Sequence, residues 1–403
     1  MSESAPPPTW AGVEAAAELL AGVAEETPLA HSRWLSELTG TEVLLKCENL
    51  QRTGSFKLRG AYTRISRLSE AERAAGVVAA SAGNHAQGVA LAAQMLGIPA
   101  RIFMPEGAAL PKVQATQGYG AEIELVGVDV GASIAAAQEF SASTGAVMIH
   151  PFNHSDIVVG QGTVGLEILR QLPDVGTVLV PVGGGGLVAG IALLREVRPD
   201  VRIVGVQTSA VSPYVPSLSA GRPLLVPGLP TMADGIAVAE PGAVPFAVVA
   251  DLVDDVVTVS EESLSRALIG LLERAKLLVE PAGAAGVAAL LDHPKDFPGP
   301  VVPVLSGGNI DALLLLEVIR HGLKAAGRFL SFRVHLTDRP GELMRLLTDL
   351  ASMQVNILNV VHDRASESLG VGEVEVRLQV ATRGARHADR VLDQLASRGY
   401  RSV

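Results

Sequence analysis

The sequence predicts an α/β fold followed by a separate C-terminal module. From Glu42 to Ser331, apolar strand-like runs alternate with Ala- and Leu-rich helical patterns, which is typical of parallel βαβ units. The chain has 403 residues and exceeds the size at which one core usually stops growing, so more than one domain is expected. Its composition, 48% apolar with 42 glycines and 24 prolines, suits a globular protein with many tight turns.

The alternation is clearest in two places. The run GVVAASAG predicts a strand, HAQGVALAAQMLG a helix and ARIFMP the next strand, and TVLVPVGG and VRIVGVQ repeat the strand pattern. The stretch 175–194 has no charged residue and is long enough to span a membrane. Because Pro181 and four glycines interrupt it, we expect a buried strand, a loop and a helix start, and no transmembrane segment.

The pattern changes near residues 325–330. The rest of the chain predicts a strand (SFRVHLT), a helix (PGELMRLLTDLASM), two strands (VNILNVVHDR and GEVEVRLQV) and a helix (ADRVLDQLASRG). One more strand would complete a ferredoxin-like βαββαβ unit, but only residues 400–403 remain to form it. We therefore place the domains at 1–328 and 329–403 and expect a short last strand or one supplied differently.

Composition also excludes several classes of function. The net charge of −10 without clustered Lys and Arg argues against a nucleic-acid binder. The single cysteine, Cys47, can form no internal disulfide and lacks partners for a zinc site, so we expect a buried thiol and no metal site. The N-terminus MSESAPPPTW lacks the basic and apolar regions of a signal peptide, which predicts a cytoplasmic protein.

A run of four glycines lies between an apolar strand pattern and a helical pattern. Bare backbone at a helix N-terminus can wrap closely around a phosphate; the alternative is a flexible or tightly packed turn. Neither a Walker lysine nor a clear GxGxxG motif with an acidic partner is present. The loop, Gly183, Gly184, Gly185 and Gly186, therefore predicts a phosphate ligand without specifying a nucleotide.

Two further loops carry polar side chains that could react or bind. Lys57 follows the aromatic Phe56, and desolvation there would lower its pKa and make its amine a nucleophile, although an isolated lysine is more often a solvated surface charge. Ser81, Gly83 and Asn84 precede a helical segment whose free N–H groups suit an anion.

Six short motifs follow one another along the chain: GSFKLRGA, SAGNHAQG, GGGGL, ADGIAV, EPAGA and SGGN. This order resembles the fold-type II pyridoxal-phosphate (PLP) enzymes, and the match is close to the threonine dehydratases, or threonine ammonia-lyases. The resemblance covers about residues 27–323. It implies a tryptophan synthase β-like fold with two parallel-sheet α/β subdomains. It also implies conversion of L-threonine to 2-oxobutanoate and ammonia, and of L-serine to pyruvate, in isoleucine biosynthesis or threonine catabolism.

The resemblance also assigns roles to residues of this chain. Lys57 is similar to the lysine that forms the Schiff base and then removes the Cα proton, and Phe56 to the residue packing on the cofactor ring. Asn84 resembles the partner of the ring hydroxyl and Ser306 the residue facing the pyridine nitrogen. Ser81 and Asn84 are expected to bind the substrate carboxylate. The phosphate cradle is expected to comprise Gly183, Gly184, Gly185, Gly186 and Leu187.

Two alternatives remain open at this point. A serine racemase or serine dehydratase would share the fold, but the racemases it resembles carry a second serine as a base where this chain has Ala82. A non-catalytic amino-acid sensor is the other alternative. His85 is interpreted as a structural hydrogen bonder rather than a base. Gln207 stands where relatives often begin a divalent-cation site with glutamate, which disfavours a tight magnesium or calcium site and leaves a monovalent ion open.

The C-terminal module resembles an ACT domain, a class that binds amino acids, commonly at a dimer interface. The resemblance makes Asp338, Gly341, Asn356 and Asn359 candidates for regulatory contacts. Helix capping is the simpler explanation for Asp338, and a strand-edge turn is an alternative for Asn356. We expect an effector such as isoleucine or valine and a homodimer or homotetramer, with a module that serves assembly alone as the alternative.

Overall fold

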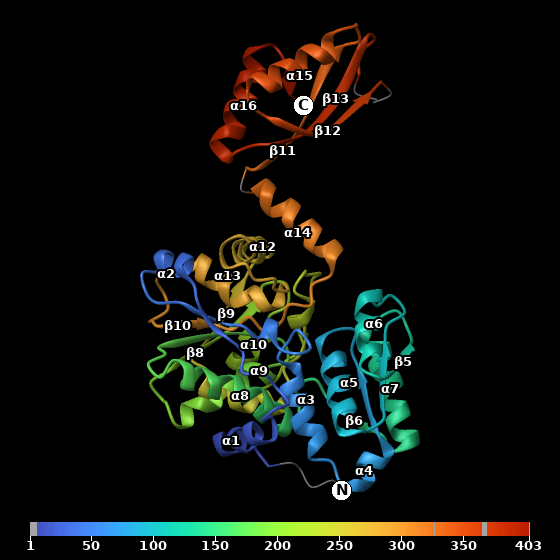
Figure 1. Ribbon diagram of the computed structural model, residues 1–403, viewed down its shortest axis with the longest axis vertical. Helices are drawn as coiled ribbons and strands as arrows, with labels where there is room; N and C mark the ends of the chain where they lie inside the picture. The colour runs from blue at the N-terminus through green and yellow to red at the C-terminus, as the bar shows by residue number, and fades with distance from the viewer. Residues whose placement is uncertain (1–5, 326, 365–368, 403) are drawn as a thin grey trace. The chain divides into compact units, whose positions relative to one another are not determined.

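A computed structural model describes residues 6–325, 327–364 and 369–402. These residues form two compact units that divide between Leu314 and Leu315 (Figure 1). The boundary predicted from sequence, between residues 328 and 329, lies 14 residues later, after helix α14 (Ala312–Ala325). Among the described residues, no helix is both long enough and apolar enough to cross a membrane.

The first unit contains two parallel four-stranded sheets. The alternating pattern predicts parallel βαβ units, and the family resemblance implies two subdomains. The first sheet has the order β5-β4-β3-β6 and the second has the order β10-β7-β8-β9. A short antiparallel pair, β1 and β2, precedes them. The strands are β1 (Leu29–His31), β2 (Leu44–Lys46), β3 (Val77–Ala80), β4 (Ala100–Met104), β5 (Glu122–Leu125), β6 (Val147–Met148), β7 (Thr177–Pro181), β8 (Arg202–Thr208), β9 (Asp255–Val259) and β10 (Val301–Pro303).

Helices connect the strands and cover the sheets. Local sequence sets many of their ends: Ser69 and Glu72 form a capping box at the start of α4, and Gly97 closes α5 in the left-handed conformation. The helices of this unit are α1 (Trp10–Leu19), α2 (Arg33–Thr39), α3 (Lys57–Ser66), α4 (Glu70–Ala75), α5 (Asn84–Leu96), α6 (Leu110–Gly118), α7 (Val130–Thr144), α8 (Ser155–Gln171), α9 (Gly186–Ala192), α10 (Tyr214–Ala220), α11 (Ala243–Leu252), α12 (Glu261–Gly270) and α13 (Ala285–Asp292).

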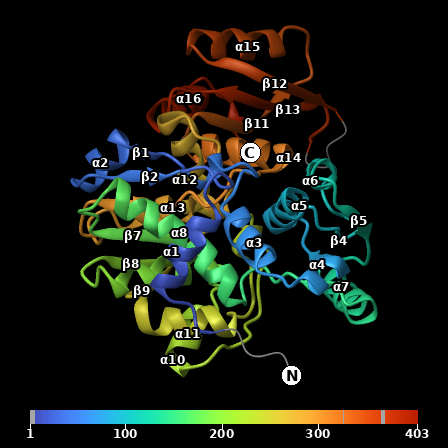
Figure 2. The same ribbon diagram turned by 60° about the horizontal axis from the view of Figure 1, so that its bottom comes forward.

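Helix α3 lies between α5 and α8, and so between the two sheet layers (Figures 1 and 2). Glycines make this close approach possible. A Cβ at Gly88 of α5 would come within 3.0 Å of the Lys57 carbonyl carbon, and one at Gly160 of α8 within 2.7 Å of the Arg59 carbonyl oxygen. The helix that begins at Lys57 is therefore fixed by backbone-to-backbone packing on both sides.

The charge-free stretch 175–194 forms the buried strand β7, a glycine loop and helix α9, as predicted. Every residue of β7 is buried, as expected for a central strand of a parallel sheet covered on both faces. The predicted buried thiol is also confirmed, because Cys47 is free, fully buried and donates to the Leu45 carbonyl.

The second unit contains an antiparallel sheet of order β12-β13-β11-β14 with two helices packed on it. The last strand is two residues long and pairs with β11, so it is short, one of the two outcomes expected. Leu346 and Leu350 of one helix and Val391 and Leu395 of the other are buried in its core. Its elements are β11 (Phe329–Thr337), α15 (Glu342–Ser352), β12 (Asn356–Asp363), β13 (Glu373–Ala381), α16 (Ala385–Ser397) and β14 (Arg401–Ser402).

Candidate active site

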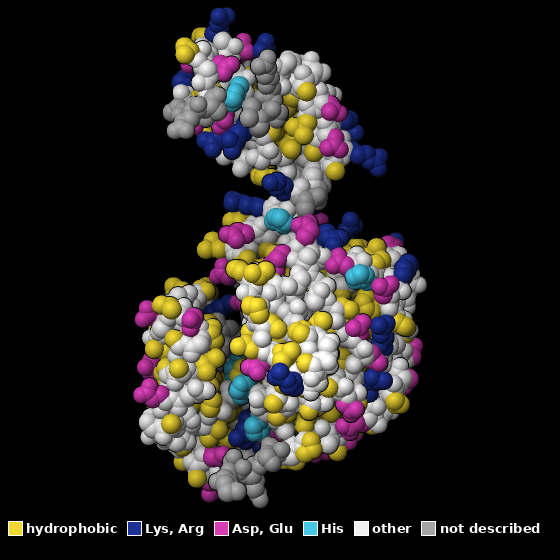
Figure 3. Space-filling view, turned by 180° about the vertical axis from the view of Figure 1, so that it is seen from behind, with side chains coloured by type: hydrophobic (Ala, Val, Ile, Leu, Met, Phe, Trp, Pro, Cys, Tyr) yellow, Lys and Arg dark blue, Asp and Glu magenta, His cyan; other side chains and the backbone are white. Residues whose placement is uncertain are grey.

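Polar residues of the first unit gather where its parallel strands end. Ser81 directly follows β3, Gly183 lies two residues after β7, and Ser306 three residues after β10. The carboxyl ends of parallel strands form the usual ligand-binding edge of such sheets. Figure 3 shows this unit hollowed between two lobes, with histidine side chains along the hollow.

Lys57 opens α3 and is partly buried. Its Nζ donates a hydrogen bond to the Pro151 carbonyl at 3.2 Å and lies 5.0 Å from the centroid of the Phe56 ring. Burial lowers the pKa of Lys57 to about 8, while the nearby Glu280 carboxylate acts in the opposite direction. An amine with this pKa is neutral, and so nucleophilic, in a substantial fraction of molecules near neutral pH.

Hydrogen bonds connect the predicted site residues to one another. The Phe56 N–H donates to the Ser306 carbonyl at 3.2 Å, which places the residue before Lys57 against the loop after β10. Asn84 donates through Nδ2 to Glu280 Oε1 at 2.7 Å, and the Glu280 N–H donates to the Gly307 carbonyl. Phe56, Lys57, Asn84 and Ser306 are therefore parts of one site.

The glycine loop belongs to the same site through residues 151 and 152. Phe152 follows the residue that accepts the Lys57 hydrogen bond, and its ring would lie 2.4 Å from a Cβ at Gly184. Gly185 has φ +99°, and a Cβ there would lie 1.8 Å from the Tyr214 hydroxyl oxygen. Only glycine fits these positions. The fifth residue of the predicted cradle, Leu187, is buried in the core.

The backbone of this loop offers hydrogen-bond donors. The N–H groups of Gly183, Gly184 and Gly185 have no acceptor among the residues that the structure describes. Buried N–H groups are rarely left without a partner, and these lie directly before a helix N-terminus. A loop that combines bare backbone with free donors fits a phosphate group.

Ser81 is only half-buried, and its hydroxyl accepts a hydrogen bond from the Gly83 N–H at 3.1 Å. This bond shapes the turn that leads into α5. The bond is local to that turn and does not reach Lys57, so the predicted part of Ser81 in substrate binding stays a prediction.

Two histidines lie near Lys57, and both are held neutral. His85 Nε2 donates to the Ile149 carbonyl at 2.7 Å, and burial together with the Lys57 charge lowers the pKa of His85 to about 3. His150 Nδ1 accepts from two backbone N–H groups, and the same causes lower the pKa of His150 to about 4. The geometry of His85 agrees with its interpretation as a structural hydrogen bonder.

Glu280 and Asn309 are site residues that the sequence interpretation missed. Both lie in motifs that carried the family resemblance, EPAGA and SGGN, but neither received a role. Burial, aided by the charge of Asp234, raises the pKa of Glu280 to about 7. One carboxylate within the apolar run LLVEPAGAAGVAALL was a usable signal, because a charge is rarely buried without a partner.

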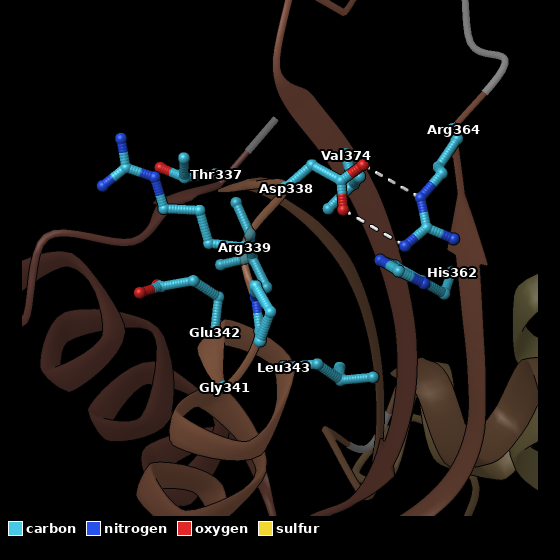
Figure 4. A pocket seen from close by; sticks show the side chains of 11 residues that line it. Thr337, Asp338, Arg339, Gly341, Glu342, Leu343, His362, Arg364 and Val374 are labelled. Atoms are coloured by element: carbon cyan, nitrogen blue, oxygen red, sulfur yellow. Dashed lines mark hydrogen bonds and ion pairs between the residues drawn. The ribbon is translucent and has the colours of Figure 1, made fainter.

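Asp338 does not cap helix α15, contrary to the simpler sequence interpretation. The cap position is Gly341, with φ +91° and no side-chain cap bond. Asp338 instead accepts two hydrogen bonds from the Arg364 guanidinium, at 3.0 and 3.1 Å, as Figure 4 shows. The pair with Arg364 is favoured over a single helix-capping hydrogen bond because both carboxylate oxygens of Asp338 accept an N–H from the guanidinium.

Asp338, Gly341 and Arg364 line a pocket of about 330 Å³ in the second unit (Figure 4). His362 and the apolar Leu343 line it as well. Asn356 and Asn359, the other two predicted regulatory residues, lie exposed on β12 and do not line this pocket. The structure thus brings together two of the four predicted residues and separates the others.

The first unit combines a partly buried lysine amine with a nearby loop of free N–H donors. The amine can bind a carbonyl group and the loop can bind a phosphate, so these features define a class of enzyme that uses a phosphorylated carbonyl cofactor. A family model described as "Pyridoxal-phosphate dependent enzyme" matches residues 20–307, and the chain belongs to this family.

Relatives with known names are similar over almost the whole chain. The L-threonine ammonia-lyase of Geobacter sulfurreducens is 49% identical over 93% of this chain and 94% of its own length. The L-threonine ammonia-lyase of Thermotoga maritima is 46% identical over 97% of this chain and 98% of its own length. Among solved structures, a threonine deaminase from T.th. has a TM-score of 0.72 at 41% identity, covering 75% of this chain and 99% of its own. Maize serine racemase has a TM-score of 0.74 at 34% identity, and the match covers 79% of this chain and 99% of the racemase chain.

Proposed function

We propose that this protein is a PLP-dependent L-threonine ammonia-lyase, which forms 2-oxobutanoate and ammonia and also accepts L-serine. The observation that carries the proposal is the partly buried Lys57 amine, which donates to the Pro151 carbonyl beside the glycine loop with its free N–H groups. The substrate class follows from the two relatives named L-threonine ammonia-lyase, whose similarity includes the C-terminal unit.

The family resemblance supplies the roles of the residues that would hold the cofactor, and their convergence in one site supports these roles. Lys57 would bind PLP covalently, Phe56 would pack on its ring, Asn84 would donate to its ring oxygen and Ser306 would face its ring nitrogen. Its phosphate would accept hydrogen bonds from the N–H groups of the glycine loop, Gly183 to Gly186, next to Leu187 in the first turn of α9. When bound, PLP supplies an electron sink for the negative charge that develops at the substrate Cα.

In the reaction, Lys57 acts as the base. Its neutral amine would remove the substrate Cα proton, as its lowered pKa permits. Ser81 and Asn84 bind the substrate carboxylate at the start of α5, where the helix dipole favours an anion. His85 and His150 are neutral, so the low pKa of Lys57 comes from burial of its amine and not from a neighbouring positive charge.

Racemisation would require a second proton-transfer group on the opposite face of the substrate. Ala82 lies beside Ser81 and has no such group, which favours elimination over racemisation. The experiment that tests the proposed function is incubation of the PLP-loaded protein with L-threonine and L-serine. Release of 2-oxobutanoate and pyruvate supports it. Conversion of L-serine mainly to D-serine would indicate a racemase, and bound PLP without turnover would indicate a sensor.

The pKa of Lys57 predicts how cofactor loading depends on pH. Only the neutral amine attacks a carbonyl, and a lowered pKa means that the proton is lost at lower pH than in ordinary lysine. We expect the rate of PLP incorporation into the cofactor-free protein to rise up to about pH 8 and then level off. Absorbance of bound PLP, followed between about pH 6 and pH 10, measures it. A rate that continues to rise through pH 10 would contradict the lowered pKa.

We also assign residues 1–328 to catalysis and 329–403 to regulation by an ACT domain. The pocket at Asp338, Gly341 and Arg364 supports an amino-acid effector, for which isoleucine and valine are the first candidates. Its charged pair matches the two charged groups of a free amino acid, and Leu343 offers apolar contact. A homodimer or homotetramer in the cytoplasm, feeding isoleucine biosynthesis or threonine catabolism, completes the proposal.

Arg364→Gln tests the effector site. We expect it to weaken effector binding by roughly 10- to 100-fold, because a charged hydrogen bond to the carboxylate is lost. Calorimetric titration of the full chain with isoleucine and with valine measures the change. Arg383→Gln is the matched control, since Arg383 pairs with Gln354 and does not line the pocket. Equal binding by both variants would place the effector elsewhere.

A further inference from the structure

The Asn84 side chain is held from two sides by residues of the second sheet layer. Its Nδ2 donates to Glu280 Oε1 at 2.7 Å, and its Oδ1 accepts from Asn309 Nδ2 at 2.8 Å. Asn84 itself begins α5, which follows the first sheet. Three segments far apart in the chain therefore converge on one amide group.

The orientation of this amide follows from the chemistry of its partners. Asn309 Nδ2 also donates to the Thr53 carbonyl at 2.7 Å, which only an NH2 group can do. The Asn84 atom that faces Asn309 is therefore its oxygen, and the Asn84 NH2 group faces Glu280. One N–H of that group donates to Glu280, and the other has no acceptor among the described residues.

Glu280 is itself rigidly placed. It is 6% exposed, and its N–H donates to the Gly307 carbonyl at 3.0 Å. Its carboxylate packs so closely on Gly307 that a Cβ there would lie 2.3 Å from Oε1. Lys57, Asp234 and Lys112 are the charged groups that act on it. A carboxylate confined in this way can fix the position of the amide that donates to it.

We infer that Glu280 is a positioning residue that holds the Asn84 amide so that its second N–H donates to the ring oxygen of PLP. The inference rests on the proposed function, in which Asn84 contacts that oxygen. A hydrogen-bond donor favours the ionised form of the oxygen. Glu280 therefore acts through Asn84 on the ionisation of the cofactor ring, and touches neither cofactor nor substrate.

The test compares Glu280→Ala and Glu280→Gln in the full, PLP-loaded chain. Alanine removes the acceptor of the Asn84 N–H, whereas the glutamine Oε1 can still accept it. We expect Glu280→Ala to shift the absorbance of bound PLP toward the form with a protonated ring oxygen. We also expect it to lower kcat for L-threonine roughly 10- to 100-fold with a smaller change in KM. Glu280→Gln should keep most of the wild-type absorbance spectrum and most of the wild-type kcat.

Glu196→Ala is the matched control, because this carboxylate accepts the Trp10 N–H at 3.0 Å, in a part of the first unit away from Asn84. Its spectrum and kinetics should equal those of the wild type. Thermal unfolding of each variant establishes that it is folded, and the isosteric Gln variant carries the test should the Ala variant not fold.

Three results would overturn the inference, and they can be told apart. An unchanged spectrum and kcat in Glu280→Ala, with normal turnover by the wild type, refute the positioning role alone. A folded Glu280→Gln that behaves like the Ala variant shows that Glu280 acts through its charge rather than as an acceptor. A wild type that neither binds PLP nor converts L-threonine refutes the proposed function, and the inference with it.

Discussion

Lys57→Ala is expected to abolish 2-oxobutanoate formation, with a loss of at least about 10³-fold in kcat, because it removes both the covalent attachment of PLP and the base. The nearby His85 and His150 are poor substitutes as a base, because burial lowers their pKa values to about 3 and about 4, and His85 Nε2 already donates to the Ile149 carbonyl. Steady-state turnover and the absorbance of bound PLP, measured together, check this prediction.

Lys324→Ala is the control for loss of a positive charge, since Lys324 is exposed on α14. It should retain full activity and the cofactor band. Turnover by Lys57→Ala within about tenfold of the wild type would remove Lys57 from the mechanism. It would also leave the family membership intact, which rests on the match over residues 20–307.

Arg59→Met is expected to have the largest effect on stability. Arg59 is 1% exposed and pairs with Glu48 at 2.8 Å and Glu167 at 2.6 Å, and Glu167 also pairs with Lys46 at 2.5 Å. Burial acts to raise the pKa of Glu48, but the Arg59 guanidinium more than offsets this and the pKa is lowered. Methionine would leave that carboxylate buried without its cation.

Removing one partner of a buried ion pair costs about 3–5 kcal/mol, and we expect a loss of this size in the free energy of unfolding of the first unit. Urea unfolding followed by tryptophan fluorescence reports on this unit, because both tryptophans, Trp10 and Trp34, lie in it. Arg33→Met is the control: Arg33 forms an exposed i,i+4 pair with Glu37, and its unfolding midpoint should not move. Equal midpoints for the two variants would show that the buried pairs are energetically neutral.

The Arg59 network also fixes the active site. Arg59 lies two residues after Lys57 on α3, and its partners lie in other segments, Glu48 after β2 and Glu167 on α8. The ion pairs therefore hold the helix that presents Lys57 in a defined place between the two sheet layers. The sequence motif GSFKLRGA contains both residues, but only Lys57 could be given a role from it.

Local patterns in the sequence determined much of this protein. The alternation of strand and helix runs predicted parallel βαβ units, and the charge-free stretch 175–194 was correctly interpreted as strand, loop and helix. Such patterns are reliable because burial on one or both faces imposes a fixed period on apolar residues. The order of six motifs identified the family, which the match over residues 20–307 confirms.

The tertiary structure alone decided which side chains meet. Glu280 and Asn84 are 196 residues apart in the chain, and no local pattern encodes their hydrogen bond. Asp338 had a local explanation as a helix cap, but pairing with Arg364, which lies on a different segment, replaced it. Periodicity reports the environment of each residue, whereas partners across the fold depend on how the sheets and helices pack, and the most informative site contacts in this protein are of that kind.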